Sequence, residues 1–135
     1  MAYSNYALEY QKQAANVASP VGLVVMLYDG ALKFMEQGKA AMIRNDLPAQ
    51  NQNLQRAQKI VFHLMATLDM EKGGEISANL MSLYNYVIER LVSANVHDKT
   101  SFVEDAIRTF TELRGGWADL DEKLKNERTS ELIAA

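Results

Sequence analysis

Residues 103–124, VEDAIRTFTELRGGWADLDEKL, place an apolar side chain at every third or fourth position. An α-helix with 3.6 residues per turn brings such positions onto one face and leaves the polar residues on the other. The spacing therefore predicts an amphipathic helix that packs on one side against a core. Its expected buried stripe is Val103, Ala106, Phe110, Leu113, Trp117, Leu120 and Leu124.

Three further stripes with this spacing lie upstream, separated by residues that start or stop helices. Those residues are Ser19-Pro20, the run from Asn45 to Pro48, Gly73-Gly74, the polar run 95–100, and Ser101 with Glu104. They predict helices over 20–44, 47–72, 75–96 and 101–125. No stretch of useful length alternates with the period of a strand, so the expected fold is all-α. The links are short, and short links make successive helices antiparallel. The expected fold is therefore an antiparallel four-helix bundle over 20–125, followed by a charged tail over 126–135.

The expected core takes one stripe from each helix. In chain order, the first three stripes are Leu23, Leu27, Phe34 and Ala41; Leu47, Leu54, Ala57, Val61, Leu64 and Leu68; and Ile76, Leu80, Leu83, Val87, Leu91 and Ala94. Gly30 and Gly38 in the first helix would let a neighbouring helix come close.

The composition is that of one small globular domain. The 135 residues are 48% hydrophobic and 23% charged, with a net charge of −3. This is too apolar for a disordered chain and too acidic for a surface that binds a row of phosphates. No apolar run approaches the roughly 18 residues of a membrane span, and the first residues do not resemble a signal peptide. We therefore expect a cytosolic protein with no nucleic-acid partner and no membrane insertion.

Motifs for catalysis or for a cofactor are missing from the sequence. It contains no cysteine, and its 2 histidines, His63 and His97, have no partner at the spacing of a metal site. No glutamate precedes a histidine in the Glu-x-x-His motif of di-iron bundles. The glycine pairs at 73–74 and 115–116 lack the lysine of a phosphate-binding loop. We therefore expect no enzymatic activity, no metal and no cofactor.

Apolar residues outside the expected core are the more informative feature. In the first helix they are Val24, Tyr28, Met35 and Met42, and further round Val25, Leu32 and Ile43. In the third helix they form a second stripe of Met81, Ile88 and Val92, with Tyr84 between the two stripes. Such faces are either covered by the bundle itself or form a groove for an apolar segment of a partner. Both explanations stay open for the first helix, and the groove is favoured for the third.

The segment 1–19 has a tyrosine-lined face. Tyr3, Tyr6, Tyr10, Ala14 and Val17 would share one side of a helix. A helix this short is marginal alone, so it must dock on apolar surface. It is either a permanent fifth element or a movable lid over the spare apolar face, and we favour the lid.

Three blocks of sequence resemble the bacterial flagellar secretion chaperones of the FliS family, which hold unpolymerised flagellin. The first block is Ser19-Pro20, Leu23 and Met26-Leu27-Tyr28-Asp29-Gly30-Ala31. The second is Leu68-Asp69, Glu71-Lys72-Gly73-Gly74-Glu75-Ile76-Ser77 and Asn79-Leu80, continuing through Leu83-Tyr84, Tyr86, Arg90-Leu91 and Ala94-Asn95. The third is Leu113-Arg114 with Trp117. The blocks stand in the expected order and cover roughly residues 10–120.

The resemblance implies a four-helix antiparallel bundle, often with a short N-terminal helix as cap, and no enzymatic activity. It implies that the partner is the C-terminal segment of flagellin, disordered when free and helical when bound, and that the flagellar export gate receives it. Tyr10 matches the family's N-terminal tyrosine, a position associated with flagellin binding and its gating. Gly115-Gly116 depart from the family, so we expect a kink in the last helix or the close approach of a neighbour there.

The residues and the resemblance together give an expected flagellin-binding surface. It consists of Tyr10, Val24, Tyr28, Leu32, Met35, Met81, Tyr84, Ile88 and Val92. Covering flagellin's apolar helix there would prevent premature polymerisation before delivery to the type III export apparatus. Two alternatives stay open. One is a regulatory module for another amphipathic segment, such as an anti-sigma factor or an export-gate component, and the other is an enzyme whose site assembles only in space.

Overall fold

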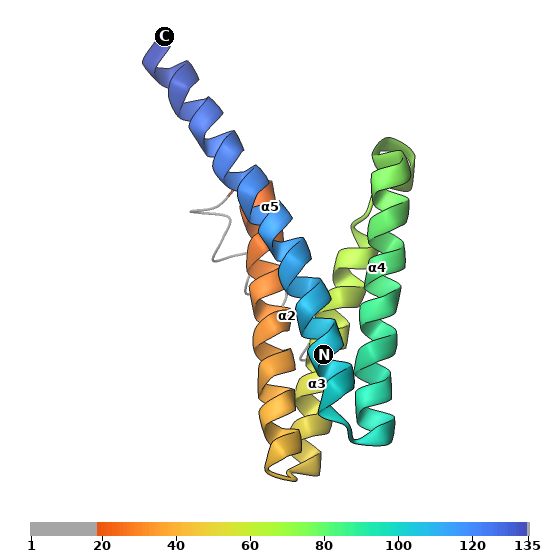
Figure 1. Cartoon of the computed structure of the whole chain (residues 1–135). Helices are drawn as coiled ribbons and strands as arrows, with labels where there is room; N and C mark the ends of the chain where they lie inside the picture. The colour runs from red at the N-terminus through yellow and green to blue at the C-terminus, as the bar shows by residue number, and fades with distance from the viewer. Residues whose placement is uncertain (1–18, 135) are drawn as a thin grey trace.

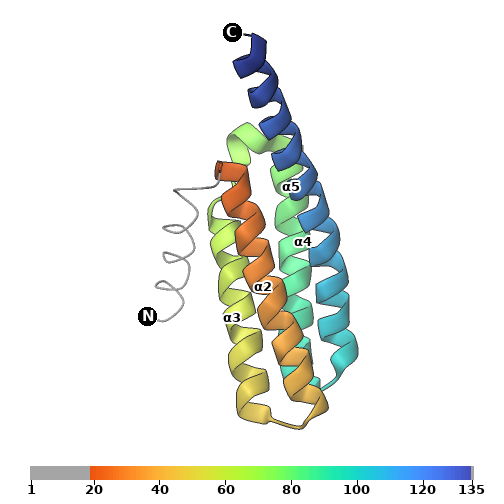
Figure 2. The same ribbon diagram turned by 90° about the vertical axis from the view of Figure 1, so that its left-hand side faces the viewer.

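The computed structural model describes residues 19–134, and these form four helices and no strand. The helices are α2 (Pro20–Ile43), α3 (Leu47–Ala66), α4 (Met70–His97) and α5 (Thr100–Ala134). Successive helices run antiparallel, and the end of α5 projects beyond the bundle (Figure 1). α2 and α4 each pack against both α3 and α5 (Figure 2). The predicted all-α bundle is confirmed.

Side chains that cap the helices explain where three of them begin. Ser19 Oγ accepts the Gly22 N–H at 3.0 Å, with Pro20 in the first turn of α2. Asp46 does the same for α3 through the Ala49 N–H at 3.2 Å. These carboxylate and hydroxyl oxygens accept hydrogen bonds from N–H groups that the first turn of a helix leaves without a partner. Both caps were predicted from the sequence.

The boundaries around Gly73-Gly74 differ from the prediction. α3 ends at Ala66 and not at 72, and Asp69 caps α4 by accepting the Glu71 and Lys72 N–H groups. Gly74 then interrupts the helical backbone with φ 51° and ψ −124°, a conformation that favours glycine. The glycine pair therefore lies in the first turns of α4 and does not terminate the preceding helix.

The fourth helix also departs from expectation. It begins at Thr100, ahead of Ser101, and it continues to Ala134 through the segment expected to be a tail. Gly115 and Gly116 lie within it, and a Cβ atom on either would meet nothing within 4 Å. The expected close approach of a neighbour is therefore wrong, and α5 runs as one helix across the glycine pair.

The core lies where the inner faces of the four helices meet. All four predicted stripes contribute to it, through residues such as Leu27, Leu54, Leu91 and Phe110. Tyr28, Met35 and Met42 are buried too, although they were expected beside the core stripe. The reason is that α2 is covered on two sides, by α3 and by α5. The spare apolar face expected on the first helix is therefore largely core.

Five residues expected in the core are exposed instead: Leu47, Ile76, Leu83, Leu120 and Leu124. Four of them belong to α4 and α5: Ile76, Leu83, Leu120 and Leu124. Figure 1 shows that the end of α5 diverges from α4. The spacing of the stripe was correct, but the two helices diverge before the stripe ends.

Candidate functional site

The contact between α4 and α5 is close near the loop that joins them. The Arg90 guanidinium carbon lies 4.8 Å from the ring centroid of Phe102, and Arg90 Nη1 lies 3.6 Å from Asp105 Oδ2. Further from the loop, the ring centroids of Tyr84 and Phe110 are 6.2 Å apart. These pairs fix the register of the two antiparallel helices. Residues before Tyr84 on α4 therefore lie alongside residues after Phe110 on α5.

Beyond this contact, apolar side chains of both helices are incompletely covered. Ile76 and Leu83 precede Arg90 at seven-residue intervals, so they lie on the side of α4 that faces α5. Ile76 is 72% exposed and Leu83 is 37% exposed, while Leu120 and Leu124 on α5 are 40% and 41% exposed. We call the following set the α4/α5 face: Ile76, Leu80, Leu83, Leu113, Trp117, Leu120 and Leu124.

Charged residues are missing from the part of α4 that borders this face. The segment from Ile76 to Ile88 contains no Asp, Glu, Lys or Arg. Its other exposed positions are Ala78, Asn79, Ser82, Asn85 and Tyr86. Depletion of charge is typical of the centre of a protein–protein interface, whereas a solvent-facing helix normally carries charges. This half of α4 therefore has the composition of a surface that a protein partner covers.

A hydrogen-bonded aromatic cluster joins α2, α4 and α5 at the base of the α4/α5 face. The hydroxyl oxygens of Tyr28 and Tyr84 are 2.6 Å apart, and Trp117 Nε1 donates to Tyr28 Oη at 3.1 Å. Tyr28 also stacks on Phe110 with the ring centroids 4.2 Å apart. Burial raises the pKa of both tyrosines above the usual value, so the cluster is neutral at physiological pH.

A second apolar stripe lies on the opposite flank of α4. Met81, Ile88 and Asn95 follow one another at seven-residue intervals, and Asn95 Oδ1 accepts a hydrogen bond from Gln50 Nε2 of α3 at 3.3 Å. This flank therefore faces α3. Ile88 packs partly against the core, whereas Val92 is exposed. We call Met81, Ile88 and Val92 the α4 stripe.

The structure places eight of the nine predicted site residues, in three environments. Tyr28, Met35 and Tyr84 are buried in the core and offer no surface in this conformation. Val24 and Leu32 are partly buried against the core, and Met81, Ile88 and Val92 share one flank of α4. Tyr10 lies outside the described residues. The α4/α5 face was missed, although the charge-free run 76–88 is a signal that would have located it.

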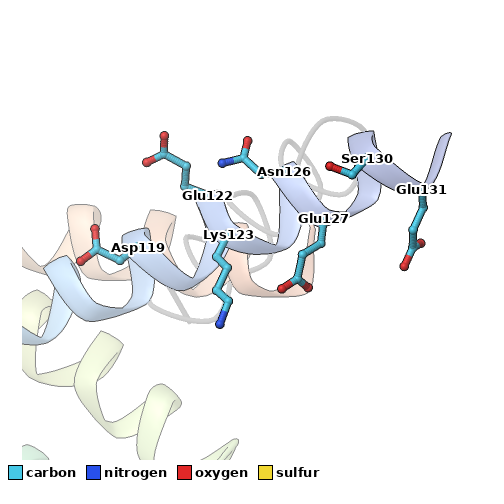
Figure 3. Close-up of a pocket in the computed structure, with 7 residues that line it drawn as sticks. All are labelled: Asp119, Glu122, Lys123, Asn126, Glu127, Ser130 and Glu131. Carbon is cyan, nitrogen blue, oxygen red and sulfur yellow. The ribbon is translucent and has the colours of Figure 1, made fainter. Parts of the chain in front are cut away.

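A hollow along the projecting end of α5 is open and lined by polar and charged residues (Figure 3). Its residues are all exposed, and four are acidic: Asp119, Glu122, Lys123, Asn126, Glu127, Ser130 and Glu131. In residues 19–134, no three His, Cys, Asp or Glu side chains gather in a way that could hold a metal ion. None of the described helices combines the length and the hydropathy that crossing a membrane requires. The apolar surfaces of α4 and α5 are therefore the best candidates for a functional site.

Comparison with known proteins identifies the family of this chain. The family model for "Flagellar protein FliS" matches residues 2–124. The chain belongs to the FliS family. A FliS protein of Bacillus subtilis is 33% identical over 128 residues, which is 95% of this chain and 95% of that protein.

Two further relatives extend the match to other bacteria. The protein of Vibrio cholerae is 31% identical over 131 residues, covering 97% of this chain and 94% of the relative. The protein of Salmonella typhimurium is 34% identical over 119 residues, covering 87% and 88%. All three relatives are named flagellar secretion chaperone FliS, and none is named as an enzyme. The FliS match includes the whole α4/α5 face and ends at its last residue, Leu124.

Proposed function

We propose that this protein is a cytosolic flagellar export chaperone that binds the disordered C-terminal segment of flagellin and delivers it to the type III export apparatus. Membership of the FliS family supports the chaperone role. The observation that carries the proposal is the partly exposed α4/α5 face beside a segment of α4 without charge.

The chemistry of this surface suits an amphipathic helix as ligand. Leucine, isoleucine and tryptophan side chains offer large apolar contact area and few hydrogen-bonding groups. A disordered segment that folds along such a surface buries roughly 1,000–3,000 Å² and loses about 2–5 kcal/mol to its own ordering. While bound, the apolar helix of flagellin is withheld from other flagellin molecules, which prevents premature polymerisation.

The proposed contact surface consists of the α4/α5 face and the α4 stripe. Both sets draw on the charge-free segment 76–88 of α4, and Val92 continues the α4 stripe one turn beyond it. Val24, Leu32 and the buried Tyr28, Met35 and Tyr84 support this surface from within or beside the core. Tyr10 is proposed, from the family resemblance, as a contact or as part of a lid that competes with flagellin.

A pair of matched variants on α5 tests the location. Leu124 belongs to the α4/α5 face, whereas Leu132 is 73% exposed near the end of the same helix and outside the face. Leu124→Glu should weaken binding of full-length flagellin at least tenfold, because it buries a charge in the interface. Leu132→Glu should change it less than twofold in the same titration calorimetry.

Flagellin without its C-terminal segment provides the test of the partner. The wild-type chain should bind full-length flagellin and lose that binding when the segment is deleted. Equal affinity for both forms would contradict the proposed partner. If Leu124→Glu and Leu132→Glu change the affinity equally, the proposed location is wrong, although flagellin can still be the partner.

A further inference from the structure

Trp117 connects the surface of the molecule to its interior. Its side chain belongs to the α4/α5 face and is partly buried, and its Nε1 donates to the hydroxyl of Tyr28 at 3.1 Å. Tyr28 belongs to α2, is 0% exposed and is not one of the residues of the α4/α5 face. A fully buried group thus holds the polar atom of the largest side chain on the proposed binding surface.

We infer that Tyr28 is a positioning residue that fixes the orientation of the Trp117 ring on the α4/α5 face and thereby raises affinity for an apolar helix. The inference rests on the proposed function. Tyr28 acts without touching the partner. It supplies the hydrogen-bond acceptor that holds the indole ring against the core.

The geometry around Tyr28 makes it a rigid acceptor. Its ring stacks on Phe110 at 4.2 Å between centroids, and its hydroxyl lies 2.6 Å from that of Tyr84. The hydroxyl can therefore donate to Tyr84 while it accepts from Trp117. Both hydroxyls stay protonated at physiological pH because burial raises the pKa of each tyrosine.

Loss of the Tyr28 hydroxyl as acceptor would change the orientation of the Trp117 indole ring. A partly buried N–H without an acceptor is unfavourable, so the ring would turn to bring Nε1 to water or to the Tyr84 hydroxyl. Either movement changes the shape of the α4/α5 face. Large aromatic side chains held in one orientation contribute strongly to binding, because little conformational freedom is lost when the partner arrives.

Two variants separate positioning from general stability. Tyr28→Phe removes the acceptor of Trp117, whereas Ile60→Val shortens a buried side chain on α3 and leaves the bond between Trp117 and Tyr28 in place. Each variant is titrated as the full chain with a peptide of the flagellin C-terminal segment, after circular dichroism has shown that it is folded. Trp117 is the one tryptophan of the chain, so its fluorescence anisotropy and emission report its orientation directly.

We expect Tyr28→Phe to weaken binding roughly fivefold to tenfold, which is the scale of one lost hydrogen bond. Its free form should show lower Trp117 anisotropy and shifted emission. Ile60→Val should stay within twofold of the wild type and keep the wild-type emission. In a Trp117→Phe background, Tyr28→Phe should have no further effect on affinity. If Tyr28→Phe does not fold, replacement of Trp117 by benzothienylalanine, which keeps the ring shape without an N–H, removes the same bond from the surface side.

The outcomes distinguish the two levels of the proposal. Equal affinity losses in Tyr28→Phe and Ile60→Val, with unchanged Trp117 anisotropy, would overturn the positioning role and leave flagellin binding intact. A wild-type chain that does not bind the peptide would contradict the proposed function. In that case the spectroscopic comparison alone decides whether Tyr28 orients Trp117, with unchanged anisotropy again counting against it.

Discussion

Ser19 and Asp121, far apart in the chain, meet where α2 begins. Ser19 Oγ donates to Asp121 Oδ1 at 2.7 Å and at the same time accepts the Gly22 N–H, so one hydroxyl caps α2 and joins it to α5. Asp121 also lies 3.1 Å from Lys125 Nζ. The hydrogen bond from Ser19 is the main cause that lowers the pKa of the Asp121 carboxyl, with Lys125 adding to it.

This link predicts a pH-dependent contribution to stability. The folded-state pKa of Asp121 is lower than its unfolded value, so its stabilising effect is complete above the unfolded pKa of about 3.9 and is lost as the pH falls through the folded pKa. Asp121→Asn should therefore lower the free energy of unfolding at pH 7, and the difference from wild type should shrink at pH 3. Urea titrations at both pH values measure this. A difference that is the same at both would show that Asp121 contributes through packing alone.

Ser19→Ala should lower the free energy of unfolding more than Asp121→Asn does. It removes the cap of α2 as well as the hydrogen bond to α5, and loss of a serine N-cap costs about 1 kcal/mol. Urea unfolding at pH 7 gives both values under the same conditions. A smaller loss for Ser19→Ala would mean that the first turn of α2 satisfies its N–H groups in another way.

The glycine pair of α5 predicts two stabilising substitutions. A Cβ atom at Gly115 or Gly116 meets nothing within 4 Å, so no steric cost opposes alanine there. Glycine inside a helix is about 1 kcal/mol less favourable than alanine. Gly115→Ala and Gly116→Ala should each raise the free energy of unfolding by up to about 1 kcal/mol. Gly74→Ala is the contrasting control, because φ of 51° strains an alanine and should destabilise the chain.

The α4 stripe predicts different outcomes for two neighbouring substitutions. Ile88 packs partly against the core, whereas Val92 is 44% exposed. Val92→Asp should leave helix content unchanged and weaken binding of the flagellin segment. Ile88→Asp should weaken binding and also lower the free energy of unfolding by about 1–3 kcal/mol, because it places a charge against apolar side chains. Circular dichroism with peptide titration separates the two effects. A Val92→Asp chain that binds like wild type would remove the stripe from the proposed surface.

Tyr10→Ala tests the proposed role of the N-terminal tyrosine. We expect a changed affinity for the flagellin segment with little loss of helix content. A direct contact predicts weaker binding, and a competing lid predicts tighter binding, because the surface is then free more of the time. Peptide titrations of the two full chains decide this. Indistinguishable affinities would contradict both roles.

The sequence predicted the helices well because their signals are local. Period-3.6 stripes and capping residues such as Ser19 and Asp46 act within one or two turns, and both operate in the structure as expected. The break at Gly74 was assigned to the wrong helix. Asp69 supplies a competing cap, and Ser77 hydrogen-bonds back to the Asp69 carbonyl at 3.0 Å. Two adjacent glycines signal a break but do not say which side of it continues as helix.

The division between core and surface was less predictable, because it depends on how far apart the helices lie. Leu120 and Leu124 continue the stripe of Val103 and Phe110 without interruption, yet both are exposed, and the end of α5 diverges from α4 (Figure 1). Tyr28 was expected outside the core because its position on the helix lies beside the predicted core stripe. Its partners are Tyr84 and Trp117, which lie on other helices. A pairing at such sequence separation has no local signal.

The length of α5 has a practical consequence. A helix of 35 residues spans about 52 Å, and its last turns extend beyond the rest of the bundle (Figure 2). Ser130 is exposed on this extension, clear of the α4/α5 face. The extension is therefore a suitable attachment site, because a fluorophore or a surface tether at Ser130 would leave the α4/α5 face accessible to a partner.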